Sequence, residues 1–195
     1  MKAKLSLLGI LILLCSIPAI SQNEKDNIYS GGMLLLQPGY AFTENRHQEI
    51  QDPSLGVGGI LRFYFHKHLT VGIYGGTQRV NYNSSNSENS YLNLGYGGPF
   101  LGFTQKKGKI RYTLSAFVGG GTVKNLHIEN QSDNLLSEAY LYKNSTLIIS
   151  PILSLDYALT QRLNLTFQTV CLSGKFDGDK TLYNPVFQIG VLFCR

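Results

Sequence analysis

Tryptophan is absent from the 195 residues, cysteine occurs three times, methionine occurs twice, and only 15% of the residues are charged. So low a charge content excludes a coiled coil and a disordered chain, which are both rich in charged side chains. The chain has instead 12 tyrosines, 10 phenylalanines and 21 glycines. Aromatic side chains at this level favour β-structure. Because the length also suits one domain, the sequence predicts a single all-β unit.

The N-terminus has the pattern of a secretory signal peptide. Lys2 and Lys4 precede an apolar run over 5–14, and small residues follow at 18–21. The run is shorter than the roughly 20 apolar residues that a membrane-spanning helix needs. We expect three segments: a cleaved signal peptide over 1–21, a short lead-in over 22–28, and the mature domain over 29–195.

The mature chain is only mildly basic. Without Lys2 and Lys4 it holds 15 basic and 12 acidic residues, which gives a net charge of +3. Nucleic-acid-binding domains concentrate far more positive charge, so we predict no nucleic-acid partner. No motif in the chain predicts a cofactor.

Apolar and polar residues alternate through most of the mature chain, with the two-residue period of β-strands that have one apolar face. In one clear case, Tyr112, Leu114 and Val118 occupy one face while Thr113 and Ser115 occupy the other. Polar clusters divide this pattern into eight predicted strands. These strands are 29–43, 54–66, 69–82, 91–105, 110–124, 145–158, 162–172 and 185–194.

The connections between the predicted strands alternate in length. Short breaks fall at 66–68, 106–109 and 159–161, whereas long polar segments fall at 44–53, 83–90, 125–144 and 173–184. In an up-and-down meander every second connection lies at the same end, so the short turns gather on one rim. Bacterial outer-membrane barrels show this asymmetry, and the predicted strands satisfy the roughly 9 to 11 residues that cross a bilayer. The sequence therefore predicts an antiparallel, up-and-down, eight-stranded transmembrane β-barrel.

The mature chain resembles the small outer-membrane barrels of the OmpA transmembrane-domain, OmpX and OmpW types. Its last strand is similar to their assembly signal, in which a polar residue, a glycine and an aromatic residue occur in order: here Gln188, Gly190 and Phe193. The chain departs from that pattern at its end, where Arg195 replaces the usual terminal aromatic residue. The resemblance implies residence in the bacterial outer membrane, with membrane lipid and the barrel-assembly machinery as partners.

A barrel of eight strands encloses a space that side chains just fill, so we expect a packed lumen and no open channel. Arg111 and Asp156 belong to the tight-turn ends of adjacent strands, and we expect them to pair because a buried charge needs a partner. The predicted lumen network comprises Arg62, Tyr64, Arg111, Asp156, Gln168 and Gln188.

The segment 125–144 is the candidate for function, because loops of this length in a compact domain are functional or disordered. We expect surface binding, adhesion or envelope support through the external loops. The ligand or protein partner stays unidentified. The candidate partner-binding residues are His127, Glu129, Asp133, Glu138 and Tyr140.

A secreted lipocalin is an alternative, since it is also an eight-stranded antiparallel barrel. Its Gly-x-Trp signature is impossible in a chain without tryptophan. The apolar face of a lipocalin lines an internal cavity, so the orientation of Leu114, Leu165 and Ile189 distinguishes the two barrels.

A lipid A-modifying enzyme is the other alternative. A hydrolase of that kind brings a histidine, a serine and an acid together. His127, Glu129, Ser132 and Ser137 form the only nearby set, and Glu129 stands where the His-x-Ser arrangement has its serine. We therefore predict no catalytic activity.

Three local patterns concern the histidines, one strand and the cysteines. His66 and His68 have the spacing of metal ligands but no evident third ligand, so we predict no metal site there. The apolar phase changes within 91–105, which predicts a β-bulge over 97–99. Cys171 and Cys194 belong to opposite ends of strands, too far apart for a disulfide.

Overall fold

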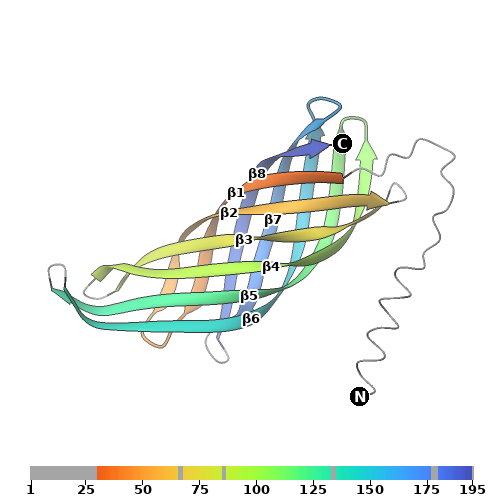
Figure 1. Cartoon of the computed structure of the whole chain (residues 1–195). Helices are drawn as coiled ribbons and strands as arrows, with labels where there is room; N and C mark the ends of the chain where they lie inside the picture. The colour runs from red at the N-terminus through yellow and green to blue at the C-terminus, as the bar shows by residue number, and fades with distance from the viewer. Residues whose placement is uncertain (1–29, 66–67, 85–86, 133–134, 177–179, 195) are drawn as a thin grey trace, which may run out of the picture.

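Eight antiparallel strands follow one another around a closed barrel (Figure 1). The computed structural model describes residues 30–65, 68–84, 87–132, 135–176 and 180–194, and the expected signal peptide and lead-in lie outside them. Within the described residues no helix is long and apolar enough to cross a membrane. The strands are β1 (Ser30–Glu44), β2 (Glu49–Phe65), β3 (Leu69–Ser84), β4 (Ser87–Lys107), β5 (Ile110–Ser132), β6 (Leu135–Ala158), β7 (Leu163–Lys175) and β8 (Thr181–Cys194). The predicted all-β, up-and-down architecture is confirmed.

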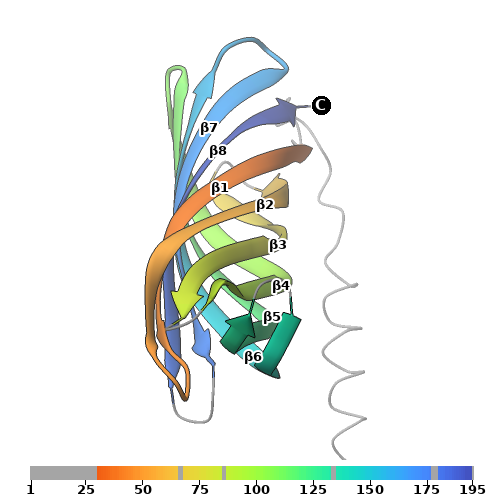
Figure 2. The same cartoon turned by 90° about the vertical axis from the view of Figure 1, so that its left-hand side faces the viewer.

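The barrel closes because β1 pairs with β2 on one side and with β8 on the other. Figure 2 shows β8, β1 and β2 side by side, with the strands coiled around the barrel axis. One end, the tight-turn rim, contains the connections at 66–68, 108–109 and 159–162. The other end, the hairpin rim, contains the connections at 45–48, 85–86, 133–134 and 176–180.

The apolar stripe of the strands faces outward. Leu114 is 57% exposed and Ile189 is 50% exposed, while their strand neighbours Thr113 and Gln188 are buried. Leu165 is half-buried. This orientation is the one expected of a barrel surrounded by lipid, and it is opposite to that of a lipocalin.

The predicted long loops are wrong, because most of their residues continue the strands. β5 ends at Ser132 and β6 begins at Leu135, so the described residues of the segment 125–144 belong to two paired strands of a β-hairpin. The other three long connections shorten in the same way. The physical reason is that strand pairing depends on backbone hydrogen bonds, which continue through a hairpin even where polar and apolar residues do not alternate regularly.

The bulge predicted over 97–99 is also wrong. Gly97, Gly98 and Pro99 pair with consecutive residues of β3 in an unbroken ladder. The side-chain phase of β4 is constant, with Leu94 facing the lumen and Leu101 facing outward. The apolar side chains change face because the lumen near the hairpin rim is itself apolar.

Each of three prolines inside a strand lies at a gap in one of the two hydrogen-bond ladders that flank its strand. Pro151 pairs with Ala116 of β5, and it lies in a gap of the β6–β7 ladder. Pro99 lies in a similar gap between β4 and β5, and Pro38 in one between β1 and β8. A proline lacks the amide hydrogen that the ladder would use, so each gap marks the side to which the missing hydrogen would point.

Candidate functional site: the lumen network and the hairpin rim

A buried ion pair organises the lumen near the tight-turn rim. Arg62 is 1% exposed, and its Nη1 lies 3.2 Å from Oδ2 of Asp156. Arg62 also donates hydrogen bonds to Ser154 and Gln168, and Asp156 accepts one from Thr166 at 2.7 Å. These bonds give each buried charge several partners, which burial of an ion pair requires.

The strand register places Arg111 directly opposite Asp156, on the neighbouring strands β5 and β6. Its guanidinium lies 4.2 Å from the centre of the Tyr64 ring, which is a cation–π arrangement. Tyr64 in turn donates to Asp156 at 3.4 Å. The short ion pair of Asp156 is formed with Arg62, across the lumen from β2.

The network continues from this ion pair towards the hairpin rim. Gln168 donates to Gln188 at 2.7 Å, and Gln188 donates to the hydroxyl of Tyr74. Tyr74 and Tyr96 share a hydrogen bond of 2.8 Å, and Tyr96 donates to Gln37 at 2.7 Å. Sequence reasoning missed Tyr74 and Tyr96, because alternation alone groups tyrosine with the lipid-facing aromatic residues. It also missed Gln37, although a polar side chain within a predicted strand was a signal for the lumen.

Above this network the lumen is filled by apolar side chains. The buried members near the hairpin rim include Val80, Leu92, Leu94, Val123, Ile148, Leu172 and Leu182. Polar and apolar side chains therefore both contribute to a packed lumen, with the buried ion pair towards the tight-turn rim. Such an interior holds the strands together and leaves the outer face and the rims for contact with other molecules.

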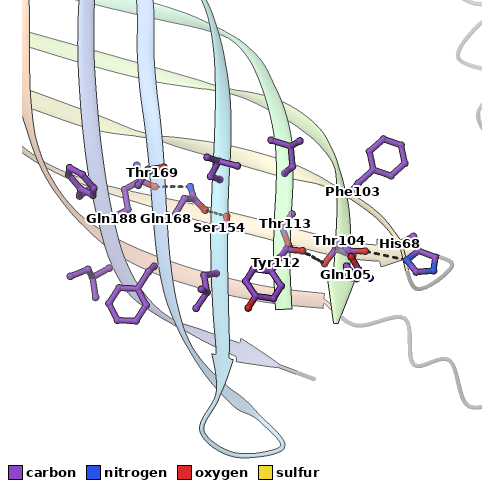
Figure 3. A pocket seen from close by; sticks show the side chains of 16 residues that line it. His68, Phe103, Thr104, Gln105, Tyr112, Thr113, Ser154, Gln168, Thr169 and Gln188 are labelled. Carbon is purple, nitrogen blue, oxygen red and sulfur yellow. Dashed lines mark hydrogen bonds between the residues drawn. The ribbon is translucent and has the colours of Figure 1, made fainter. Parts of the chain in front are cut away.

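The outward wall is concave over β4 to β8. A groove of about 910 Å³ lies there, and Figure 3 shows the side chains around it, with one hydrogen bond between Thr113 and Thr104 and another between Ser154 and Gln168. Its outward-facing lining is mostly apolar and includes Phe103, Tyr112, Leu114, Leu153, Phe167, Phe187 and Ile189, beside the polar Gln105 and Thr169. A groove of this composition suits a lipid acyl chain.

The residues expected to bind a partner lie on the β5–β6 hairpin. His127 is buried in β5 and pairs across the hairpin with Tyr140 of β6. Glu129 is half-buried, Glu138 is exposed and accepts a hydrogen bond from Tyr140 at 2.5 Å, and Asp133 lies outside the described residues. This hydrogen bond to Glu138 raises the pKa of Tyr140 to about 12.

His127 belongs to a cluster that closes the lumen at the hairpin rim. The hydroxyl of Tyr82 lies 3.3 Å from Nδ1 of His127 and accepts a hydrogen bond from Asn125 at 2.8 Å. Asn45 donates to the same hydroxyl at 3.2 Å. Burial lowers the pKa of His127, the nearby His47 lowers it further, and Glu129 acts in the opposite direction.

His47 joins this cluster from the turn between β1 and β2. Its ring stacks on that of His127 with centroids 4.4 Å apart, and its Nε2 lies 2.9 Å from the hydroxyl of Tyr142. Its Nδ1 lies 3.7 Å from Oε2 of Glu129. Sequence reasoning missed His47, because 80 residues separate it from His127 and no local pattern links them.

The serine candidates do not converge on His127. The ring of His127 bonds to Tyr82 and stacks on His47, and among the described residues no hydrogen bond joins it to Ser132 or Ser137. A nucleophilic serine needs its base within hydrogen-bond reach. The arrangement therefore gives no support to a hydrolase.

The other histidine and cysteine expectations concern the barrel ends. Nδ1 of His68 lies 3.4 Å from the carbonyl oxygen of Thr104, and His66 lies outside the described residues. Cys171 is a free cysteine opposite Pro185 in the β7–β8 ladder, whereas Cys194 pairs by its backbone with Gly31 at the tight-turn rim.

The assembly-signal residues occupy three different environments on β8. Gln188 belongs to the lumen network, and Phe193 is exposed on the outer face. A Cβ atom on Gly190 would lie 2.4 Å from the carbonyl oxygen of Leu34, so no larger residue fits there without a shift of the backbone.

A closed ring of eight antiparallel strands, apolar outside and packed inside, defines the fold of the small bacterial outer-membrane β-barrels. The chain is similar in structure to Ail, the attachment invasion locus protein of Yersinia pestis, at 12% identity and a TM-score of 0.54, over 85% of this chain and 99% of Ail. It is also similar to Neisserial surface protein A, at 10% identity and a TM-score of 0.56, over 85% and 97% of the two chains. OprG of Pseudomonas aeruginosa matches at 12% identity and a TM-score of 0.53, over 85% and 97%. No family model matches the sequence, and no curated protein matches it.

Proposed function

We propose that this chain resides in the bacterial outer membrane and binds a partner at the cell surface through the β5–β6 hairpin. The outward apolar wall and its groove support contact with membrane lipid. Gln188, Gly190 and Phe193 support recognition by the barrel-assembly machinery, through the resemblance of the last strand to the assembly signal. We place the hairpin rim at the exterior, because β5 and β6 extend farthest at this end of the barrel and the longer segments of outer-membrane barrels are extracellular.

The open edge of β6 is the observation that carries surface binding. The β6–β7 ladder ends at the pair of Ile148 and Gly174, and among the described residues none pairs with 135–147 on the β7 side. An unpaired edge presents a row of backbone donors and acceptors to which an extended segment of another chain adds as a further strand. Leu135 and Leu141, both exposed on β6, supply apolar contacts beside this edge.

The charge of the hairpin favours a protein over a sulfated glycan as the partner. Ail has been solved in complex with the heparin analogue sucrose octasulfate. On this chain, Lys124 and Lys143 are balanced by Glu129 and Glu138 over the same part of the hairpin. Recognition of a polyanion needs a concentration of basic side chains, which this hairpin does not offer.

The position of Pro151 shows how the edge can be tested. In an antiparallel strand the backbone groups of alternate residues point to opposite neighbours. Pro151 would direct its missing amide hydrogen to β7, and the β5–β6 register is constant from there to residue 139, so Leu141 directs its amide to the same open side. Leu141→Pro therefore blocks the open edge and leaves the β5–β6 ladder intact.

The experiment compares cells that display the wild type, Leu141→Pro or Leu141→Ala. Attachment to a panel of immobilised extracellular proteins is measured at equal amounts of folded barrel in the membrane. We expect Leu141→Pro to reduce attachment at least tenfold and Leu141→Ala to retain most of it. Equal attachment by the wild type, Leu141→Pro and a variant that lacks 126–142 would contradict the proposal.

Envelope support is a second candidate, and the lumen network is the observation that favours it. A buried, extensively hydrogen-bonded interior makes a rigid element in the membrane. Loss of permeability control in cells that lack the whole protein, with normal permeability in cells whose copy lacks 126–142, would assign the function to the barrel wall.

A further inference from the structure

Two histidines and a carboxylate meet at the hairpin rim with the composition of a transition-metal site. His127 and Glu129 lie two residues apart on β5, at the point where the β5–β6 register shifts between Ile128 and Asn130. His47 reaches them from the turn between β1 and β2, and one potential ligand atom from each residue lies within 4.8 Å of the other two.

The turn that carries His47 is built to hold it in place. The side-chain Oδ1 of Asn45 accepts hydrogen bonds from the backbone amides of His47 at 2.8 Å and Gln48 at 2.7 Å. Asn45 is buried, and its amide group donates to the hydroxyl of Tyr82. The same asparagine therefore anchors the turn to the side chain that contacts His127.

The hydrogen bonds of the two histidine rings leave one nitrogen on each ring for a ligand bond. Nε2 of His47 bonds to the hydroxyl of Tyr142, and Nδ1 of His127 bonds to the hydroxyl of Tyr82. In metal sites the second ring nitrogen of a ligand histidine almost always has a hydrogen-bond partner, which fixes the ring and its tautomer. Nδ1 of His47 and Nε2 of His127 are the nitrogens that remain.

The distances fit a tetrahedral site after a small movement. With bonds of about 2.0–2.1 Å to nitrogen and oxygen, tetrahedral zinc holds neighbouring ligand atoms roughly 3.4 Å apart. Nδ1 of His47 and Oε2 of Glu129 lie 3.7 Å apart, close to that spacing. Closing a separation of up to 4.8 Å to this spacing takes an inward shift of about 1.4 Å. The stacked rings of His47 and His127 must also turn so that one nitrogen of each faces the metal.

We propose that His47, His127 and Glu129 bind a divalent transition metal of the zinc class at the outer end of the barrel. Imidazole nitrogens favour such a metal over calcium or magnesium, which take oxygen ligands. Three protein ligands leave a fourth position for water or for a group of a partner molecule. The metal would join the β1–β2 turn to the β5–β6 hairpin and stabilise the rim, whether or not the hairpin binds a protein.

The test is a calorimetric titration of Zn²⁺ alone into the mature barrel, purified without a polyhistidine tag and held in nanodiscs. All four histidines of the chain are His47, His66, His68 and His127, so His66→Ala/His68→Ala is the matched control at the opposite rim. We expect one Zn²⁺ per chain, retained in this control and weakened at least 100-fold by His47→Ala and by Glu129→Gln. Tyr142→Phe, which removes only the outer hydrogen bond of His47, should weaken binding 10- to 100-fold.

Folding of each variant is checked by its mobility in unheated denaturing gels, and the ligand set by the visible absorption of bound Co²⁺. A tetrahedral Co²⁺ spectrum that His47→Ala abolishes supports the proposal. Unchanged Zn²⁺ affinity in folded His47→Ala, absence of binding by the wild type, or loss of binding only in the His66→Ala/His68→Ala control would overturn it.

Discussion

The substitution Asp156→Asn tests the lumen network, because it removes one charge of a buried pair and keeps the shape of the side chain. Arg62 is 1% exposed and lies 3.2 Å from Asp156. Breaking a buried ion pair in this way costs about 3–5 kcal/mol, since the remaining charge loses its counterion. Hydrogen bonds from Arg62 to Ser154 and Gln168 remain in the variant. We therefore expect the lower end of the range, about 3 kcal/mol.

The assay is equilibrium unfolding in urea with the barrel inserted in lipid vesicles. Because the chain has no tryptophan, unfolding is followed by far-ultraviolet circular dichroism and by gel mobility. With a urea dependence of about 2 kcal/mol per molar, the midpoint should fall by roughly 1.5 M.

Two further variants test whether the loss of stability in Asp156→Asn comes from the unpaired charge of Arg62. Asp52→Asn removes the same charge near the hairpin rim, and we expect a change below about 0.5 kcal/mol. Arg62→Met combined with Asp156→Leu removes both charges and should be more stable than Asp156→Asn, because apolar residues of similar volume often replace a buried ion pair without loss. A midpoint for Asp156→Asn equal to that of Asp52→Asn would refute the reasoning.

Three other predictions follow from the wall, the strand packing and the hairpin. Leu114→Arg should destabilise the inserted barrel by about 2–4 kcal/mol, whereas Leu135→Arg at the tip of the hairpin should change its urea midpoint little; equal effects would contradict the lipid-facing assignment. Gly72→Ala places a Cβ 1.9 Å from the carbonyl oxygen of Leu61, whereas Gly120→Ala meets nothing within 4 Å, so only Gly72→Ala should lower the folded yield. Glu138→Gln should lower the pKa of Tyr140 from about 12 towards the ordinary value of about 10, measured as the difference in tyrosinate absorbance from the wild type; an unchanged titration would exclude the hydrogen bond.

The sequence was sufficient to predict the number of strands, their order and the residues that share the apolar stripe. Alternation alone did not decide whether that stripe faces lipid or an internal cavity; the exposure of Leu114 and Ile189 decides it. Alternation marks a strand wherever one face meets lipid and the other meets the lumen, as at Thr113 and Leu114. Alternation marks no strand in the outer part of the β5–β6 hairpin, where polar and apolar residues do not alternate regularly, so the segment 125–144 had the pattern of a loop. Backbone pairing decides the structure there.

The lumen and rim clusters were harder to predict, because their members come from distant strands. Arg111 and Asp156 are neighbours in the ladder, and sequence reasoning could pair them. The contacts of Arg62 with Asp156 and of His47 with His127 cross the lumen or join separate hairpins. Such contacts depend on the stagger of the strands around the barrel, which alternation along one strand does not determine.

The central claim is that the apolar side chains of the strands point outward to lipid. Spin-label accessibility measures this direction most directly. Single cysteines replace Leu114, Leu153 and Phe117 in turn, in a background with Cys171 and Cys194 changed to serine, and each label is exposed to oxygen and to a water-soluble nickel chelate in vesicles. The account predicts that labels at 114 and 153 collide often with oxygen and rarely with the chelate, and that the label at 117 is shielded from both. Strong collision of the 114 and 153 labels with the chelate would contradict it.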